Sequence, residues 1–351
     1  MAAFESAPPI FAETQKRPGV FYAVSSDGVE LPIIDVTHPA FALSFDDEKQ
    51  RRMLAAYLRE QWLVGLVPAA LRRRLYRWLL RDSLLGPGMR LAEGAFLSGM
   101  STYLFKLGPD NLGRAYAKPI DRRVVGSLPG VAMRLRLSDM ASLLAEHLGP
   151  LLAAQPERPL CLLNIAGGPA MDTLNALLLL HKRDPGLLTG RVVRIALLDM
   201  VEAGPLFGAR ALRALSVSGA PLHGLDIGLE PIPYDWHDTR TLQAVLARTR
   251  GEGALVAGSS EGGLFEYGDD RAVQDNLSCL QQETPEEFVM VGSVTRGDAS
   301  LRRLHALHGV ATHPRGLPTF RRLVEPCGFR VIRAIERPFS DHVVLAHAAD
   351  T

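Results

Sequence analysis

The sequence predicts an α/β protein with a doubly wound, seven-stranded, mostly parallel sheet whose last strand is antiparallel, preceded by a mainly helical N-terminal domain. Beyond Pro159, short apolar runs alternate with segments in which apolar residues recur at helical spacing. Before that point, helical spacing dominates and a small β element stands near the start. We therefore expect a helical cap with a β-hairpin over residues 1–155 and a ligand-binding α/β domain over residues 156–351.

The N-terminal part should open with a hairpin. Phe21–Val24 and Val29–Val36 favour strands, and Asp27-Gly28 between them is typical of a tight turn. Helices are expected at Asp46–Arg59, Pro68–Leu84, Gly88–Leu107 and Leu137–Leu152. The last helix should end near Gly149-Pro150, because proline interrupts a helix. The polar, proline-flanked stretch Gln155–Pro159 marks the domain boundary.

The central element is a strand, a small-residue turn and a helix. Leu160–Ile165 is nearly all apolar, Ala166–Ala170 has little or no side chain, and Met171, Leu174 and Leu177 follow at helical spacing. This geometry directs backbone N–H groups and the positive end of a helix toward a ligand. The same unit can also be purely structural, but its glycines allow a ligand to approach the backbone closely.

The rest of the chain repeats the strand and helix alternation. Further strands are expected at Arg191–Leu198, Leu225–Trp236, Ala254–Gly258, Phe288–Val294, Phe329–Ile335 and His342–His347. Helices are expected at Pro205–Leu215, Thr239–Arg250, Asp269–Gln282 and Leu317–Cys327. Two prolines favour an edge position for Leu225–Trp236. The connection Arg337–Asp341 is too short for a helical crossover, so the last two strands should be antiparallel. Such a sheet binds ligands at the carboxyl ends of its strands.

Composition excludes some partners. The 351 residues are 47% hydrophobic and 22% charged, and the net charge of +1 argues against a nucleic acid as the main partner. Cys161, Cys279 and Cys327 lie far apart, which favours reduced thiols in the cytoplasm. We find no signal-like leader and no apolar run of membrane-spanning length, so we expect no membrane partner. A homodimer is left open.

Residues 159–351 resemble a class I S-adenosylmethionine-dependent methyltransferase domain. Asn164–Ala170 falls on the acidic-x-Gly-x-Gly-x-Gly pattern of this family, with Asn164 for the acid, Ala166 and Ala170 for the outer glycines, and Gly168 kept as the central one. Asp199 falls where the acid of the family accepts hydrogen bonds from the ribose hydroxyls. Val324–Val331 resembles the passage from the helix to the sixth strand.

The resemblance implies a Rossmann-like fold, S-adenosylmethionine as cofactor, and a helical cap that encloses a small organic acceptor. Trp236 would offer a stacking surface for the adenine, and Asp235 or Asp238 would accept from its amino group. The residues that the resemblance assigns to the cofactor are Asn164, Ala166, Gly167, Gly168, Asp199, Met200, Asp235, Trp236 and Ser259.

The residues after the third and fourth predicted strands are candidates for catalysis. Glu261 is the preferred base and His237 the second, because one base near the methyl group would help to remove a proton from a hydroxyl or an activated carbon. The Asn/Asp-Pro-Pro-Tyr motif of enzymes that methylate planar amino nitrogens is absent, which favours O- or C-methylation.

Other classes of function use similar elements. Three nearby histidines, His305, His308 and His313, lack a carboxylate or cysteine to complete a metal site, so no metal is expected. An NAD(P)-dependent oxidoreductase would use the same turn and acid, but no second Rossmann half or catalytic Tyr-x-x-x-Lys is found. A non-catalytic cofactor-binding protein remains an alternative.

Overall fold

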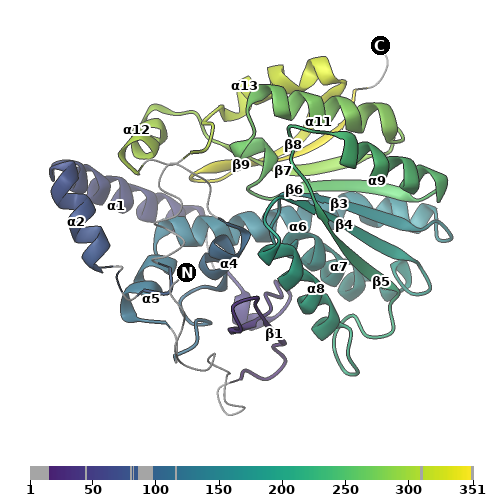
Figure 1. Ribbon diagram of the computed structural model, residues 1–351, viewed down its shortest axis with the longest axis horizontal. Helices are drawn as coiled ribbons and strands as arrows, with labels where there is room; N and C mark the ends of the chain where they lie inside the picture. Colours follow the sequence, from purple (N-terminus) through teal and green to yellow (C-terminus); the bar gives the residue numbers. More distant parts are fainter. Residues whose placement is uncertain are drawn as a thin grey trace.

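The protein has three layers, with one sheet between two layers of helices (Figure 1). The structure is a computed structural model and describes residues 16–43, 46–79, 81, 83–85, 98–114, 117–308 and 311–348. Part of the predicted helix Gly88–Leu107 therefore lies outside the described residues. The predicted α/β class and the mainly parallel sheet are both confirmed.

The main sheet has seven strands in the order β5-β4-β3-β6-β7-β9-β8. Their bounds are β3 Leu160–Ile165, β4 Val193–Asp199, β5 Ile227–Pro233, β6 Leu255–Ser260, β7 Val289–Thr295, β8 Phe329–Glu336 and β9 Ser340–His347. Strands β3 to β7 pair in parallel, and β9 runs antiparallel to both β7 and β8. The proline-containing β5 lies at the sheet edge, as expected.

Alternate residues of the central strand β3 face opposite helix layers. Leu160 and Leu162 belong to the core under one layer, whereas Cys161 and Leu163 belong to the core under the other. The first layer contains α6 Leu128–Ala154, α7 Met171–Arg183 and α8 Ala203–Leu215, and the second contains α9 Arg240–Gly251, α11 Asp270–Glu283 and α13 Gly316–Val324. Burial on both faces explains why β3 is apolar at every position except Asn164.

The N-terminal part forms the expected hairpin and helices, with differences in length. The hairpin pairs β1 Tyr22–Val24 with β2 Glu30–Pro32. The 3-10 turn η2 Pro39–Phe41 follows, and the helices are α1 Asp47–Gly65, α2 Ala69–Leu79, α4 Gly99–Leu107 and α5 Pro119–Val125. Helix α5 was not expected from the sequence, and neither was α12 Ala299–His308 in the C-terminal part.

Helix α6 corrects one sequence expectation. It begins nine residues before the predicted Leu137 and continues through Gly149 and Pro150 to Ala154. Pro150 is exposed, whereas Leu148 and Leu152 on either side of it are fully buried. The proline thus lies on the solvent face, and burial of its apolar neighbours outweighs the lost hydrogen bond.

Helix α6 also joins the N-terminal part to the sheet. It packs on α7, β7 and β9, and one continuous core includes residues from both sides of the predicted boundary, such as Tyr103 and Leu162. On the same helix, Asp139 accepts hydrogen bonds from Arg337 Nε at 2.7 Å and from His342 Nδ1 at 2.8 Å. The domain boundary near residue 155 stays a prediction, and the structure adds that α6 forms part of the layer over the sheet.

Candidate functional site

The turn after β3 takes left-handed backbone conformations at alternate positions. The φ angles are 55° at Ala166, 62° at Gly168 and 52° at Ala170. These are the three positions that align with glycine in the methyltransferase pattern. Left-handed backbone costs a residue with a side chain about 1–2 kcal/mol. The two alanines therefore keep the backbone shape of the pattern without its glycines.

Asp199 ties the end of β4 to this turn. Its Oδ2 accepts a hydrogen bond from the Gly168 N–H at 3.0 Å, and its Oδ1 accepts one from the Val201 N–H at 2.8 Å. Burial raises the pKa of Asp199, and these backbone donors offset part of that increase. Each oxygen keeps a lone pair for a further donor, so the carboxylate can still accept the two hydroxyls of a diol.

Asn164 and Ser259 support the turn from beneath. Asn164 is fully buried, and its Nδ2 lies 2.9 Å from each of Asp172 Oδ1, Thr173 Oγ1 and Ser259 Oγ, which share its two N–H donors. Its Oδ1 accepts from the Gly167 N–H at 3.1 Å. A contact of Asn164 or Ser259 with a cofactor therefore stays a prediction, whereas their role in holding the turn follows from these bonds.

A cleft opens at the carboxyl ends of β3, β4 and β6. It encloses about 540 Å³, including the part open to solvent. Residues predicted from the sequence that line it are Ala166, Gly167, Gly168, Asp199, Met200, Trp236 and Glu261. Gly262, Gly263 and Tyr267, from the segment after the fourth predicted strand, also line it, and Gly99, Thr102 and Val201 were not anticipated. Most of the cleft lining therefore follows segments that the sequence singled out. Gly99 and Thr102 come from α4, which is distant along the chain.

The residues after β5 divide between the cleft and the surface. Trp236 lines the cleft, and its Nε1 is buried without a hydrogen-bond partner in the described part of the chain. Asp235 and His237 do not line the cleft and are about half exposed, with His237 Nδ1 2.9 Å from Asp235 Oδ1. Hydrogen bonds from His237 lower the pKa of Asp235. The structure therefore separates these two predicted site residues from Trp236.

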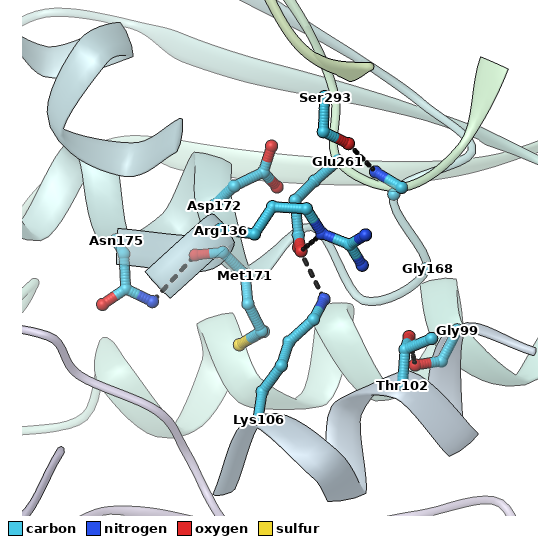
Figure 2. A network of polar contacts seen from close by, with 12 residues as sticks. Gly99, Thr102, Lys106, Arg136, Gly168, Met171, Asp172, Asn175, Glu261 and Ser293 are labelled. Carbon is cyan, nitrogen blue, oxygen red and sulfur yellow. Dashed lines mark hydrogen bonds and ion pairs between the residues drawn. The ribbon is translucent and has the colours of Figure 1, made fainter. Parts of the chain in front are cut away.

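Helix α4 begins directly against the turn. A Cβ added to Gly99 would lie 2.4 Å from Gly168 Cα, and one added to Gly204 of α8 would lie 2.9 Å from the same atom. Both glycines thus permit backbone contacts that no side chain would allow. Figure 2 shows Gly99, Thr102 and Lys106 along the face of α4 that is directed toward the turn and Glu261.

A buried ionic network is centred on Glu261, which lines the cleft (Figure 2). Glu261 accepts from Lys106 Nζ at 2.5 Å and from Arg136 Nε at 2.9 Å, and Arg136 Nη1 also lies 3.2 Å from Glu266 Oε2. All four side chains are largely buried. Burial lowers the pKa of Arg136, but the charges of Glu266 and Glu261 raise it overall. The network is electrically balanced, with two cations and two anions.

This network bears on the predicted role of Glu261 as a base. A carboxylate that is held by an ammonium and a guanidinium must give up an ion pair before it can take a proton. The geometry therefore favours a positioning role for Glu261. Its role as a base stays a prediction, as does that of His237, which pairs with Asp235 at the surface.

Asp172 adds a further charge beside the network. It is fully buried in the first turn of α7, and its Oδ2 has no hydrogen-bond partner within the described residues. Burial and the nearby charge of Glu261 raise the pKa of Asp172 to about 6. A buried titratable group next to a cleft is a common feature of functional sites.

Sequence reasoning missed Lys106, Arg136 and Asp172. One signal was available for Lys106, which is one of only five lysines and lies within the otherwise apolar run Tyr103–Leu107. A charge on an apolar helix face indicates a buried partner. No local pattern relates Lys106 to Glu261, because 155 residues separate them.

Comparisons with known proteins support the fold. No protein-family model matches the chain, and no curated protein matches it significantly. The chain is similar in structure to a possible exported protein from Bordetella parapertussis, with 19% identity over 87% of this chain and 100% of that one, and a TM-score of 0.55. At this identity the likeness shows a shared fold.

Two solved methyltransferases are more distant. One is 1,6-didemethyltoxoflavin-N1-methyltransferase from Burkholderia thailandensis with bound S-adenosylhomocysteine, which is 15% identical over 60% of this chain and 78% of that one, with a TM-score of 0.38. The other is the mitomycin 7-O-methyltransferase, which is 16% identical over 78% and 68% of the two chains, with a TM-score of 0.37. Likenesses this weak carry no argument about the site.

Among the helices that the structure describes, none combines the length and apolar character needed to span a bilayer. Within the same part of the chain, no three His, Cys, Asp or Glu side chains are placed to hold a metal ion. The cytoplasmic location and the homodimer stay predictions.

Proposed function

We propose that this chain is an S-adenosylmethionine-dependent methyltransferase that acts on a small organic acceptor. The observation that carries the proposal is Asp199, which lies in the cleft at the carboxyl end of β4 and is bonded to the left-handed turn at Gly168. The sheet order, with β9 antiparallel between β7 and β8, is the order implied by the resemblance to class I methyltransferases.

The residues of the cleft fit such a cofactor. Asp199 can accept two ribose hydroxyls as charge-assisted hydrogen bonds. Trp236 offers an aromatic face, and its buried Nε1 lacks a partner that a ligand acceptor could supply. When bound, S-adenosylmethionine supplies an electrophilic methyl group. We propose that Ala166, Gly167 and Gly263 line the side from which the ligand reaches the turn, since Gly99 covers Gly168.

The chain's contribution to catalysis would be positioning. Methyl transfer is an in-line displacement, and holding the two reactants close and aligned lowers its barrier by several kcal/mol. The buried ion pairs with Lys106 and Arg136 would hold Glu261, which lines the cleft, in one arrangement. We retain O- or C-methylation as the proposed reaction, because the motif for planar amino nitrogens is absent.

Titration calorimetry with S-adenosylhomocysteine and with NAD tests this function. We expect the wild type to bind S-adenosylhomocysteine and not NAD. Asp199→Asn keeps the shape of the side chain, but it removes the charge and replaces one acceptor oxygen with an NH2 donor. The affinity should therefore fall by about 10- to 100-fold, or on the order of 1.5–3 kcal/mol.

Asp226→Asn is a matched control, because Asp226 is exposed and directly precedes β5, at the amino ends of the strands and away from the cleft. It should bind like the wild type. Preference for NAD would favour the oxidoreductase alternative, and equal affinity in wild type and Asp199→Asn would remove Asp199 from the site.

A further inference from the structure

A second cavity lies beside the cofactor cleft. It encloses about 330 Å³, again including solvent-open space, and lies between the segment after β2, α4 and α6. Its lining is Ile34, Val36, Phe41, Ala42, Leu43, Lys106, Arg134, Leu137 and Ser138. Lys106 lines this cavity, and its ammonium contacts Glu261, which lines the first cleft. The two cavities therefore meet at this ion pair.

The wall formed by the N-terminal segment is held to the core by defined bonds. Asn175 on α7 accepts from the Val36 N–H at 2.7 Å and donates to the Ile34 carbonyl oxygen at 2.9 Å. Tyr103 on α4 donates its hydroxyl proton to the Pro32 carbonyl oxygen at 2.6 Å. The cavity thus has a built wall, fixed from two helices.

The lining combines apolar side chains with two positive charges. Most of the lining residues are aliphatic or aromatic, and among the described residues that line the cavity none is acidic. Lys106 is almost fully buried, and its charge is balanced by Glu261 across the boundary. Glu261 is shared with Arg136, so the positive character of this cavity rests mainly on Arg134.

Arg134 has an incompletely balanced charge. It is partly buried, and no hydrogen bond or ion pair within 4 Å is found for it in the described part of the chain. Burial lowers the pKa of Arg134, and the more distant charge of Asp110 raises it again. The guanidinium lies on the backbone of Gly108, where a Cβ would come within 2.9 Å of Arg134 Cζ. A partly buried guanidinium without a close anion is strongly stabilised when an anionic ligand pairs with it.

We propose that the second cavity binds the methyl acceptor through an oxyanion such as a carboxylate, with Arg134 and Lys106 as the groups that recognise it. This inference rests on the proposed function. The apolar wall would hold the hydrocarbon or aromatic body of the acid. An anion at Lys106 would lie next to the cofactor cleft.

The test compares 2-naphthoate with 2-naphthamide, its neutral analogue, by calorimetry. The wild type should bind the acid at least about ten times more tightly than the amide, as expected for one charge-assisted hydrogen bond pair. Arg134→Gln should reduce this ratio to about three or less. Arg123→Gln, which removes an exposed arginine of α5 outside the cavity, should leave the ratio unchanged.

Ala42→Phe is a second variant that fills the cavity from an exposed position, so it should weaken both ligands. Equal binding of acid and amide, or a preference that survives Arg134→Gln, would overturn the inference. Titration of S-adenosylhomocysteine into the same samples separates the two claims. If it binds while naphthoate shows no preference, the acceptor site is wrong and the proposed function stands. If naphthoate is preferred in an Arg134-dependent way and S-adenosylhomocysteine does not bind, the anion site is supported. The proposed methyltransferase function is then wrong.

Discussion

Ala166 and Ala170 carry backbone strain that glycine would relieve. Both have φ near +50°, although Ala166 is only partly buried and Ala170 is fully buried. Removing the methyl group of a buried alanine loses about 0.8 kcal/mol of burial, which offsets much of the relief at Ala170. Ala166 is less buried, so removing its methyl group loses less burial energy. Its substitution by glycine is therefore the clearer test of backbone strain.

We expect Ala166→Gly to raise the free energy of unfolding by about 0.5–1 kcal/mol. Ala214→Gly is the matched control, because Ala214 has similar burial but lies in the right-handed helix α8. There glycine should cost about 1 kcal/mol. Urea unfolding measures the free energy of unfolding of both variants. It should show the gain in Ala166→Gly and the loss in Ala214→Gly. A loss of stability in Ala166→Gly as large as that in the control would show that the turn is not strained.

Asp172 should make stability depend on pH. Its pKa in the folded protein is about 6, above the ordinary 3.8, so the folded state binds the proton more tightly than the unfolded state. Stability therefore falls as pH rises from about 4 to about 6, and the ionised carboxylate costs on the order of 3 kcal/mol above that range.

Asp172→Asn removes this cost and still accepts from Asn164. The variant should be more stable than the wild type at pH 8, and its advantage should be about 1 kcal/mol larger at pH 8 than at pH 5. Chemical denaturation at the two pH values measures the difference. An advantage that does not change with pH, or a variant less stable at pH 8, would contradict the raised pKa.

The contact between α4 and the turn depends on glycine at both sides. Because a Cβ on Gly99 would lie 2.4 Å from Gly168 Cα, Gly99→Ala must displace α4 or the turn. We expect a loss of about 1–3 kcal/mol in stability, as for other overpacked contacts, and a change in S-adenosylhomocysteine affinity.

Gly251→Ala provides the comparison for Gly99→Ala. Gly251 ends α9 without a left-handed φ, and nothing lies within 4 Å of an added Cβ. Alanine there should be neutral or stabilising by up to about 1 kcal/mol. Thermal unfolding compares the stability of the two variants, and calorimetry compares their affinity for S-adenosylhomocysteine. Equal stability of the two variants would mean that α4 does not press on the turn.

For the whole molecule, the sequence predicted the sheet well because its inner strands are local, largely apolar runs. β3 is buried at every position, and β8 and β9 are joined by a connection too short for a crossover, so their pairing follows from length alone. Asp199 was predictable for the same reason, since it directly ends a strand whose pattern is clear.

The length of α6 and the ionic network around Glu261 depend on contacts between distant segments, which local sequence patterns do not encode. Helix α6 continues past Pro150 because Leu148 and Leu152 are buried against other elements, which only the tertiary structure reveals. Lys106 and Glu261 are brought together by the packing of α4 against the end of β6. The role of Glu261 as a base could not be judged without knowing its two cationic partners.

We propose that the cleft at the carboxyl ends of β3 and β4 binds the cofactor. Hydrogen–deuterium exchange with and without S-adenosylhomocysteine tests it most directly. We expect slower exchange confined mainly to residues 99–102, 166–168, 199–201, 236 and 261–267, which contain the lining of the cleft. Unchanged exchange throughout, or protection restricted to segments away from the cleft, would contradict the claim.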